Sequence, residues 1–197
     1  MPVRVKKMSH IGLTVRDLDR SVAFYTGVLG LRLTERFEYP PDDVGHGVAV
    51  AAGAFVRCDS THHQLSLFQL KDGLVPDGQD VTAPMLGLHH LAFEMATPAE
   101  LLDKFRELRE RGVPVVNCRK GGPGNQPRFY ARDPDGYLLE FFWGIDEIGW
   151  DGLPREYEPI QEIDLEAFDF EGFVAQREEA AARLQAAVVA APGFTSG

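Results

Sequence analysis

Apolar and polar side chains alternate in two short segments of the chain, at residues 9–15 and 89–95. Alternation with a period of two is typical of a β-strand with one buried face. In both segments the apolar residues share one face, and a histidine, His10 or His90, heads the opposite face, because successive strand side chains point to opposite sides. The recurrence of this pattern after about 80 residues predicts two similar modules in the chain.

A helical spacing of apolar residues follows each of these strands. Residues 17–29 place an apolar side chain at every third or fourth position, and Gly30 follows where a helix would end. In the second module, Thr97 and Glu100 have the spacing of a capping box, and Pro98 takes the first helical position. Both segments are therefore expected to be helices.

Three short segments with strand composition follow each predicted helix. They are residues 31–37, 47–57 and 63–70 in the first module, and residues 113–117, 127–133 and 137–143 in the second. The order βαβββ, given twice, indicates an α+β fold in which two modules pack as one domain. Residues 121–127 have the composition of a loop, and we interpret the glycine-rich run at residues 121–124 as a flexible lip over a cavity.

The paired modules occupy residues 1–145, with the first at about residues 6–70 and the second at about residues 88–145. Residues 146–197 form a C-terminal extension outside the repeat. We expect it to begin as an irregular acidic and aromatic stretch and to end in an Ala-rich helix at residues 174–191, before Pro192 and Gly193. The five aromatic residues within positions 150–173 predict docking on the domain or on a second subunit, and we expect a homo-oligomer.

Composition and charge narrow the classes of partner. The 197 residues include 30 acidic and 20 basic side chains, a formal net charge of −10, which disfavours binding to nucleic acid or to an anionic membrane surface. Cys58 and Cys118 are too few for a disulfide framework and fit a reducing compartment. No apolar run approaches the length of a membrane span, so we expect a cytoplasmic protein with small-molecule or protein partners.

Three residues have the chemistry of a metal site. His10 and His90 occupy equivalent strands and would meet near a pseudo-twofold axis if the modules pack side by side. Glu140 lies in an otherwise apolar strand, where an unpaired buried carboxylate is costly and a metal would remove that cost. Two histidines and one carboxylate form the facial triad of non-haem Fe(II) oxygenases. The alternative is that Glu140 pairs with an arginine, Arg128 or Arg132.

The hairpin before Glu140 predicts which residue lies beside it. Asp133, Pro134, Asp135 and Gly136 have the sequence of a type I turn followed by a glycine bulge. A turn of that kind places Tyr130 opposite Glu140 on the same face, whereas a two-residue turn would place Phe129 there. We favour the bulge, because Gly136 occupies its left-handed position.

These pieces in order resemble the vicinal oxygen chelate superfamily, which includes glyoxalase, bleomycin resistance and extradiol dioxygenase proteins. The resemblance covers residues 6–145. It is greatest to the catalytic module of type I extradiol catechol dioxygenases, through His10, the segments 62–67 and 89–93, and Tyr130 ten residues before Glu140. Because the chain has length for two modules only, it would be a compact single-pair member.

The resemblance implies a metal site in a concave sheet, with His10, His90 and Glu140 as ligands of Fe(II), or alternatively Mn(II). It implies that His63 is the acid/base residue near the oxygen site and that Tyr130 contacts a catechol hydroxyl. The implied activity is ring cleavage of an aromatic diol with O₂ in aromatic compound catabolism. Strand alternation instead favours His62 over His63, because it places His62 on the more polar face.

One departure from the dioxygenase pattern leaves other activities open. Those enzymes usually carry a histidine nine residues before the tyrosine, where this chain has Gly121. A glyoxalase-like isomerase, epimerase or lyase of the same superfamily is therefore an alternative. A further alternative is a protein of the bleomycin-resistance type, which sequesters a ligand without chemistry.

Overall fold

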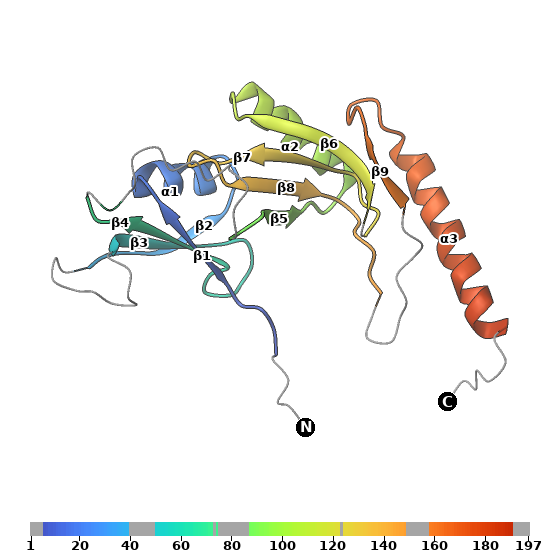
Figure 1. Cartoon of the computed structure of the whole chain (residues 1–197), viewed down its shortest axis with the longest axis horizontal. Helices are drawn as coiled ribbons and strands as arrows, with labels where there is room; N and C mark the ends of the chain where they lie inside the picture. Colours follow the sequence, from blue (N-terminus) through green and yellow to red (C-terminus); the bar gives the residue numbers. More distant parts are fainter. Residues whose placement is uncertain are drawn as a thin grey trace. The chain divides into compact units, whose positions relative to one another are not determined.

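The computed structural model describes residues 6–39, 50–72, 74, 87–122, 124–148 and 158–190, except the side chains of residues 184–190. The chain divides into two compact units (Figure 1). The first unit contains residues 1–87 together with residues 132–137, and the second contains residues 88–131 and 138–197.

The first unit contains one βαβββ module. Its elements are β1 (Ile11–Val15), α1 (Leu18–Gly27), β2 (Arg32–Glu38), β3 (Val50–Arg57) and β4 (Leu65–Leu70). The sheet has the order β1-β4-β3-β2, with β1 parallel to β4 and the other pairs antiparallel. The predicted elements of this module are confirmed, although residues 47–49 of the predicted strand lie outside the described residues.

The second unit repeats this module and adds two elements. The module consists of β5 (Leu91–Glu94), α2 (Pro98–Glu110), β6 (Val115–Gly122), β7 (Arg128–Arg132) and β8 (Leu138–Phe142), followed by β9 (Glu158–Glu162) and α3 (Phe170–Ala190). The sheet order β5-β8-β7-β6-β9 matches that of the first unit, with β9 added beside β6. The α+β fold with two βαβββ modules and a C-terminal helix is confirmed.

Both helices begin at a capping side chain, and the cap at Thr97 is the one that the sequence predicts. Asp17 caps α1 by accepting a hydrogen bond from the Arg20 amide at 2.9 Å. Thr97 caps α2 by accepting from the Glu100 amide, while the Glu100 carboxylate accepts from the Ala96 amide. These bonds satisfy amide groups that have no partner inside the helix.

Each helix covers one face of its sheet, and this leaves the other face for chemistry. In the second unit Phe105 of α2 packs edge-on against Phe129 of β7, and Phe129 stacks on Phe141 of β8. Because strand side chains alternate, the neighbours Tyr130 and Glu140 lie on the face away from α2. In the first unit α1 contacts β3 and β4 in the same way.

The turn between β7 and β8 belongs to the first unit. The buried hydroxyl of Tyr25 donates a 2.9 Å hydrogen bond to Asp133. Arg20 pairs with Asp135 at 2.6 Å, and the Tyr137 hydroxyl donates to the Thr14 carbonyl at 3.0 Å. These bonds hold the turn, residues 132–137, within the first unit.

The C-terminal extension differs from its prediction. Residues 158–162, expected to be irregular, form β9, and α3 begins at Phe170 rather than at residue 174. All five residues of β9 are exposed, and the strand is held by its backbone bonds to β6. Because no buried and exposed positions alternate along it, the sequence pattern does not predict this strand. The aromatic residues Trp150 and Tyr157 and the helix stop at residues 192–193 lie outside the described residues.

The extension docks on the second unit, as its composition predicts. Leu165 and Phe173 are buried. Glu166 bonds to Arg106 and Arg109 of α2 at 3.2 and 3.3 Å, and Arg177 of α3 donates to the carbonyl of Gly144, which follows β8. The glycine-rich run at residues 121–124 is not a free lip in its described part, because Gly121 and Gly122 are buried at the end of β6.

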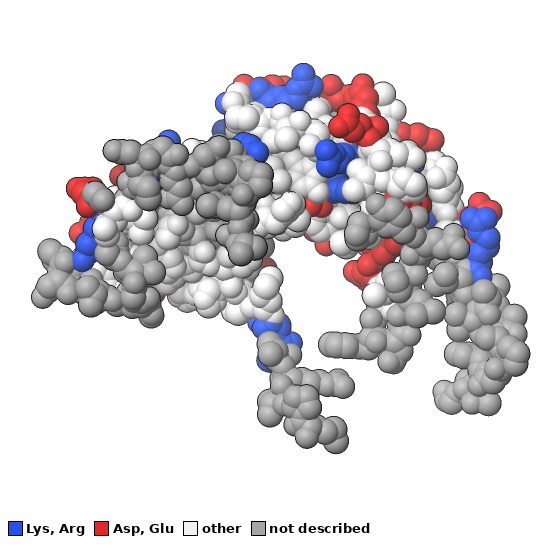
Figure 2. All heavy atoms as spheres, in the orientation of Figure 1, with Lys and Arg blue, Asp and Glu red and all other residues white. Residues whose placement is uncertain are grey.

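The surface carries charges of both signs. Figure 2 shows acidic and basic side chains next to each other along the upper edge of the visible face. On α2 these charges pair within the helix, at Lys104 with Glu107 and at Arg111 with Glu107. Within the described residues, no helix is both long enough and apolar enough to cross a membrane.

Candidate functional site

Two predicted metal ligands meet in the second unit. His90 directly precedes β5, and the parallel pairing of β5 with β8 places Ala92 beside Glu140. His90 therefore lies on the same face, and its Nε2 is 3.1 Å from Oε2 of Glu140. The Glu140 side chain is 6% exposed, whereas the His90 side chain is 32% exposed. The structure thus places a nitrogen and an oxygen donor together at a partly open position.

Tyr130 lies opposite Glu140, as the bulged turn predicts. The Asp133 amide bonds to the Tyr137 carbonyl at 3.1 Å, and the Trp143 amide bonds to the Pro127 carbonyl at 3.3 Å. Gly136 has a φ of 95°, the left-handed conformation that the bulge requires. The register with Tyr130 rather than Phe129 beside Glu140 is therefore confirmed.

The Tyr130 hydroxyl bonds to two oppositely charged side chains, the Glu140 carboxylate and the Arg128 guanidinium. Burial raises the pKa of Tyr130, and a hydrogen bond to Glu140 raises it further. Arg128 acts in the opposite direction by donating from Nε to the Tyr130 oxygen at 3.0 Å. The phenol consequently keeps its proton near neutral pH and can donate it in a hydrogen bond.

Two buried residues support Glu140 from the other side. Gln126 donates from Nε2 to Oε1 of Glu140 at 3.3 Å, and Arg128 Nε lies 3.9 Å from the same oxygen. Arg128 also donates to the carbonyls of Gly121 and Gln126 at 2.7 and 3.0 Å. The carboxylate therefore uses Oε1 toward Gln126 and Arg128 and presents Oε2 toward His90.

The arginine alternative for Glu140 is thus partly realised. Arg128 is the arginine near Glu140, while Arg132 donates to the Gly136 carbonyl at 2.7 Å. Gln126 was missed because a buried amide in a glycine-rich segment has no periodic signal. Arg128 approaches Oε1 of Glu140, whereas Oε2 faces His90.

The first unit brings His10 and His63 together. Their ring centroids are 4.5 Å apart, and the His63 ring stacks on Phe55 of β3 at 4.4 Å. Burial lowers the pKa of His63, and the neighbouring His10 and His62 lower it further. A neutral His63 can accept a proton near neutral pH.

His62 points elsewhere. Its Nε2 lies 3.7 Å from Glu35, and its Nδ1 lies 2.8 Å from Nδ1 of His63. Both histidines precede β4, which begins at Leu65, so strand alternation does not govern them. The position next to His10 belongs to His63, the residue that the family resemblance selects.

The predicted ligands are divided between the units. His10 belongs to the first unit, and His90 and Glu140 belong to the second. Neither unit, in its described residues, groups three or more His, Cys, Asp or Glu side chains that could hold a metal by themselves. The structure brings His90 and Glu140 together within one unit, and His10 as the third ligand stays a prediction.

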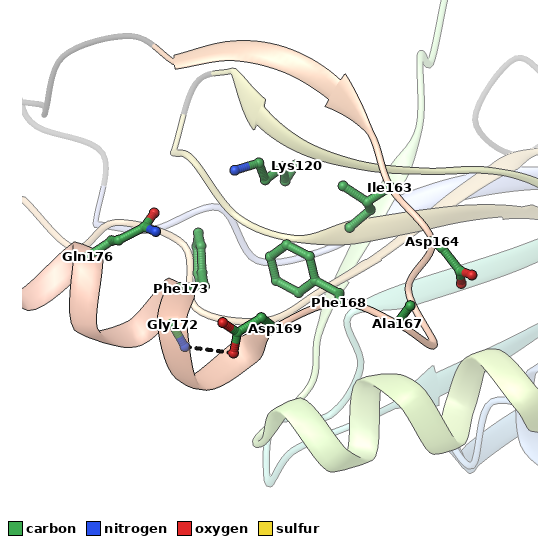
Figure 3. A pocket seen from close by; sticks show the side chains of 9 residues that line it. All are labelled: Lys120, Ile163, Asp164, Ala167, Phe168, Asp169, Gly172, Phe173 and Gln176. Carbon is green, nitrogen blue, oxygen red and sulfur yellow. Dashed lines mark hydrogen bonds between the residues drawn. The ribbon is translucent and has the colours of Figure 1, made fainter.

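A pocket of about 330 Å³ lies elsewhere in the second unit (Figure 3). Phe168, Phe173, Lys120 and Gln176 line it, together with five other residues. None of the predicted site residues lines this pocket. It is formed mainly by the C-terminal extension and is separate from the His90 and Glu140 pair.

Comparison with known proteins identifies one superfamily. The Glyoxalase/Bleomycin resistance protein/Dioxygenase superfamily matches residues 7–141. Biphenyl-2,3-diol 1,2-dioxygenase 3 of Rhodococcus globerulus is 30% identical over 68% of this chain and 61% of its own length. 3-Methylcatechol 2,3-dioxygenase of Pseudomonas putida is 28% identical over 72% of this chain and 43% of its own length. The chain therefore spans less than two thirds of either dioxygenase.

Two further relatives are similar over most of their own length. Glutathione transferase FosA of Serratia marcescens is 27% identical over 71% of this chain and 82% of that protein. A solved glyoxylase/bleomycin resistance protein/dioxygenase domain from Frankia sp. EAN1pec has a TM-score of 0.55 and 25% identity, covering 72% of this chain and 99% of that one. The similarity thus extends across more than one reaction class.

Proposed function

Because the chain belongs to the Glyoxalase/Bleomycin resistance protein/Dioxygenase superfamily, we propose that it is an Fe(II)-dependent extradiol dioxygenase that cleaves a catecholic substrate with O₂. The observation that supports this most is the arrangement of His90, Glu140 and Tyr130 on one face of the second sheet. The biphenyl-2,3-diol and 3-methylcatechol dioxygenases among its relatives add to that support. In this proposal the protein acts in the cytoplasm as a homo-oligomer.

The donor set fits a divalent metal. Glu140 supplies a buried carboxylate whose Oε2 faces His90, and Gln126 holds the other oxygen in place. In the proposal His10 of the first unit is the third ligand. Iron bound there would activate O₂ and the catecholate for reaction with each other, and Mn(II) is the alternative metal.

The surrounding residues position the substrate and move protons. Tyr130 keeps its proton and can donate it to a catechol hydroxyl oxygen, which orients the ring. His63 is neutral near pH 7, so it can accept a substrate proton and return it when the ring carbon bond breaks. Arg128 supplies a positive charge beside Tyr130, which favours an anionic substrate.

The overall reaction breaks the ring bond next to the diol and inserts both atoms of O₂. The product is a ring-opened chain with a carboxylate at one end and an aldehyde or ketone at the other. The test is anaerobic loading with Fe(II) or Mn(II), metal analysis, and an oxygen electrode with a panel of catechols. Stoichiometric O₂ uptake with a yellow product is expected, and absence of uptake with every catechol and both metals would contradict the proposal.

A second candidate is favoured by Gly121. The histidine of the dioxygenase pattern is missing there, and FosA, a relative matched over most of its length, is named a glutathione transferase. An isomerase, epimerase, lyase or transferase of this superfamily would bind metal and turn over its substrate without consuming O₂. A sequestering protein of the bleomycin-resistance type would bind its ligand unchanged. The oxygen electrode separates both from a dioxygenase.

A further inference from the structure

Strand β9 lies against the two glycines that end β6. Arg119 pairs with Glu162 and Gly122 pairs with Glu158 across the two strands. A Cβ atom at residue 121 would lie 2.3 Å from the Pro159 carbonyl oxygen, and Gly121 has a φ of 78°. Any side chain at this position would therefore displace β9. The place where the dioxygenase pattern has a histidine is taken here by the backbone of the C-terminal extension.

The side chain of Ile160 projects to the face that carries Glu140. Arg119 pairs with Arg128 on one side and with Glu162 on the other, and cross-strand partners share a face. Ile160 is two residues before Glu162, so it shares that face as well. Independently, the Cβ position of residue 122 is 3.0 Å from Ile160 Cγ1 and 3.6 Å from Arg128 Nη2.

A continuous set of contacts connects β9 with the proposed metal ligand. Arg128 holds the Gly121 carbonyl and donates to Tyr130, and Tyr130 bonds to Glu140. Ile160 lies at the outer end of this set and is 47% exposed. An apolar side chain left open beside a row of polar groups suits the apolar part of an aromatic molecule whose hydroxyls bind at the polar end.

We propose that β9 forms one wall of the substrate site and that Ile160 contacts the ring substituent of the catechol. This inference rests on the proposed dioxygenase function and names the part of the chain that selects its substrate. The C-terminal extension then borders the substrate at residue 121, where this chain has glycine instead of the histidine of the dioxygenase pattern. Substrates with an apolar substituent are preferred over catechol itself.

The test compares Ile160→Ala with Gln161→Ala as a matched control. Gln161 is the next residue of the same strand, is also exposed, and pairs with Lys120 on the opposite face. The measurements are kcat/KM for catechol and for a catechol with an apolar 3-substituent, anaerobic binding of both by calorimetry, and bound iron. Ile160→Ala is expected to lower the preference for the substituted catechol by about tenfold at unchanged iron content. Gln161→Ala is expected to keep the preference.

Gly121→Ala provides a second route to the same wall. It is expected to displace β9 and to reduce the preference in the same direction as Ile160→Ala. If the wild type cleaves both catechols and the Ile160→Ala variant keeps the same preference between them, the proposed role of β9 is wrong and the proposed dioxygenase function is unaffected. Failure of the iron-loaded wild type to bind or cleave any catechol would overturn both.

Discussion

Glu140 and Arg128 are a buried pair of opposite charges, and separating them provides a quantitative check of the site. Each side chain is 6% exposed, and the Oε1 to Nε distance is 3.9 Å. Glu140→Gln removes the negative charge and leaves the guanidinium buried. Removing one partner of a buried pair typically costs about 3 to 5 kcal/mol. Because Arg128 keeps two carbonyl acceptors, we expect about 3 kcal/mol for the metal-free protein.

The double variant Glu140→Gln with Arg128→Met leaves no unpaired charge. Its free energy of unfolding is expected to exceed that of Glu140→Gln alone and to lie within about 1 kcal/mol of the wild type. Arg132→Met is the matched control, because Arg132 lies on the same strand and donates to Gly136 instead of approaching Glu140.

Urea unfolding with a chelator present, followed by circular dichroism, measures these differences. Metal analysis of the same variants is expected to show loss of the metal with Glu140→Gln and retention with Arg132→Met. A metal-free Glu140→Gln protein as stable as the wild type would refute the reasoning. The reasoning would also be refuted if the double variant lost as much free energy of unfolding as Glu140→Gln and Arg128→Met lose separately when added together.

Three other predictions concern His63, Tyr25 and the C-terminal extension. His63→Ala is expected to keep bound iron and to lower turnover by about 10² to 10⁴-fold, whereas His62→Ala is expected to keep the wild-type rate. A slow His62→Ala protein beside a His63→Ala protein of wild-type rate would assign the proton transfer to His62. Burial raises the pKa of Asp133, and the Tyr25 hydroxyl opposes that rise because it bonds to the ionised carboxylate. Tyr25→Phe is therefore expected to lower the free energy of unfolding by about 1.5 to 3 kcal/mol near neutral pH. The loss is expected to shrink as the pH falls through the pKa of Asp133 and the carboxylate is protonated. Equal losses in urea unfolding at ~pH 7 and ~pH 4 would contradict this. Leu165→Ala is expected to destabilise the second unit by about 2 to 3 kcal/mol, because Leu165 is buried. Glu166→Ala is expected to cost less than about 1 kcal/mol, because the ion pairs of Glu166 are exposed. A larger loss for Glu166→Ala than for Leu165→Ala in thermal unfolding would show that ion pairs hold the extension in place.

Much of the fold follows from local signals in the sequence. The helix caps at Asp17 and Thr97 and the glycine bulge at Gly136 are short-range features, so their geometry depends on few neighbours. The bulge also fixes the register of the hairpin, and this is why Tyr130 could be placed beside Glu140 from the sequence.

Other features depend on contacts that a pattern does not contain. Strand β9 is exposed throughout and has no apolar alternation, so only its backbone bonds to β6 define it. Gln126 is buried by tertiary packing in a segment that has loop composition. The choice between His62 and His63 could not be made from alternation, because neither residue lies within β4.

Isotopically labelled dioxygen tests the central claim most directly. Iron-loaded protein is mixed with a catechol under labelled O₂, and the ring-opened product is trapped and analysed by mass spectrometry. The account predicts that both oxygen atoms of one O₂ molecule enter the product, one in the new carboxylate and one in the new carbonyl group, the latter measured before it exchanges with water. A product that carries no label, or a substrate converted without ring opening, would contradict it.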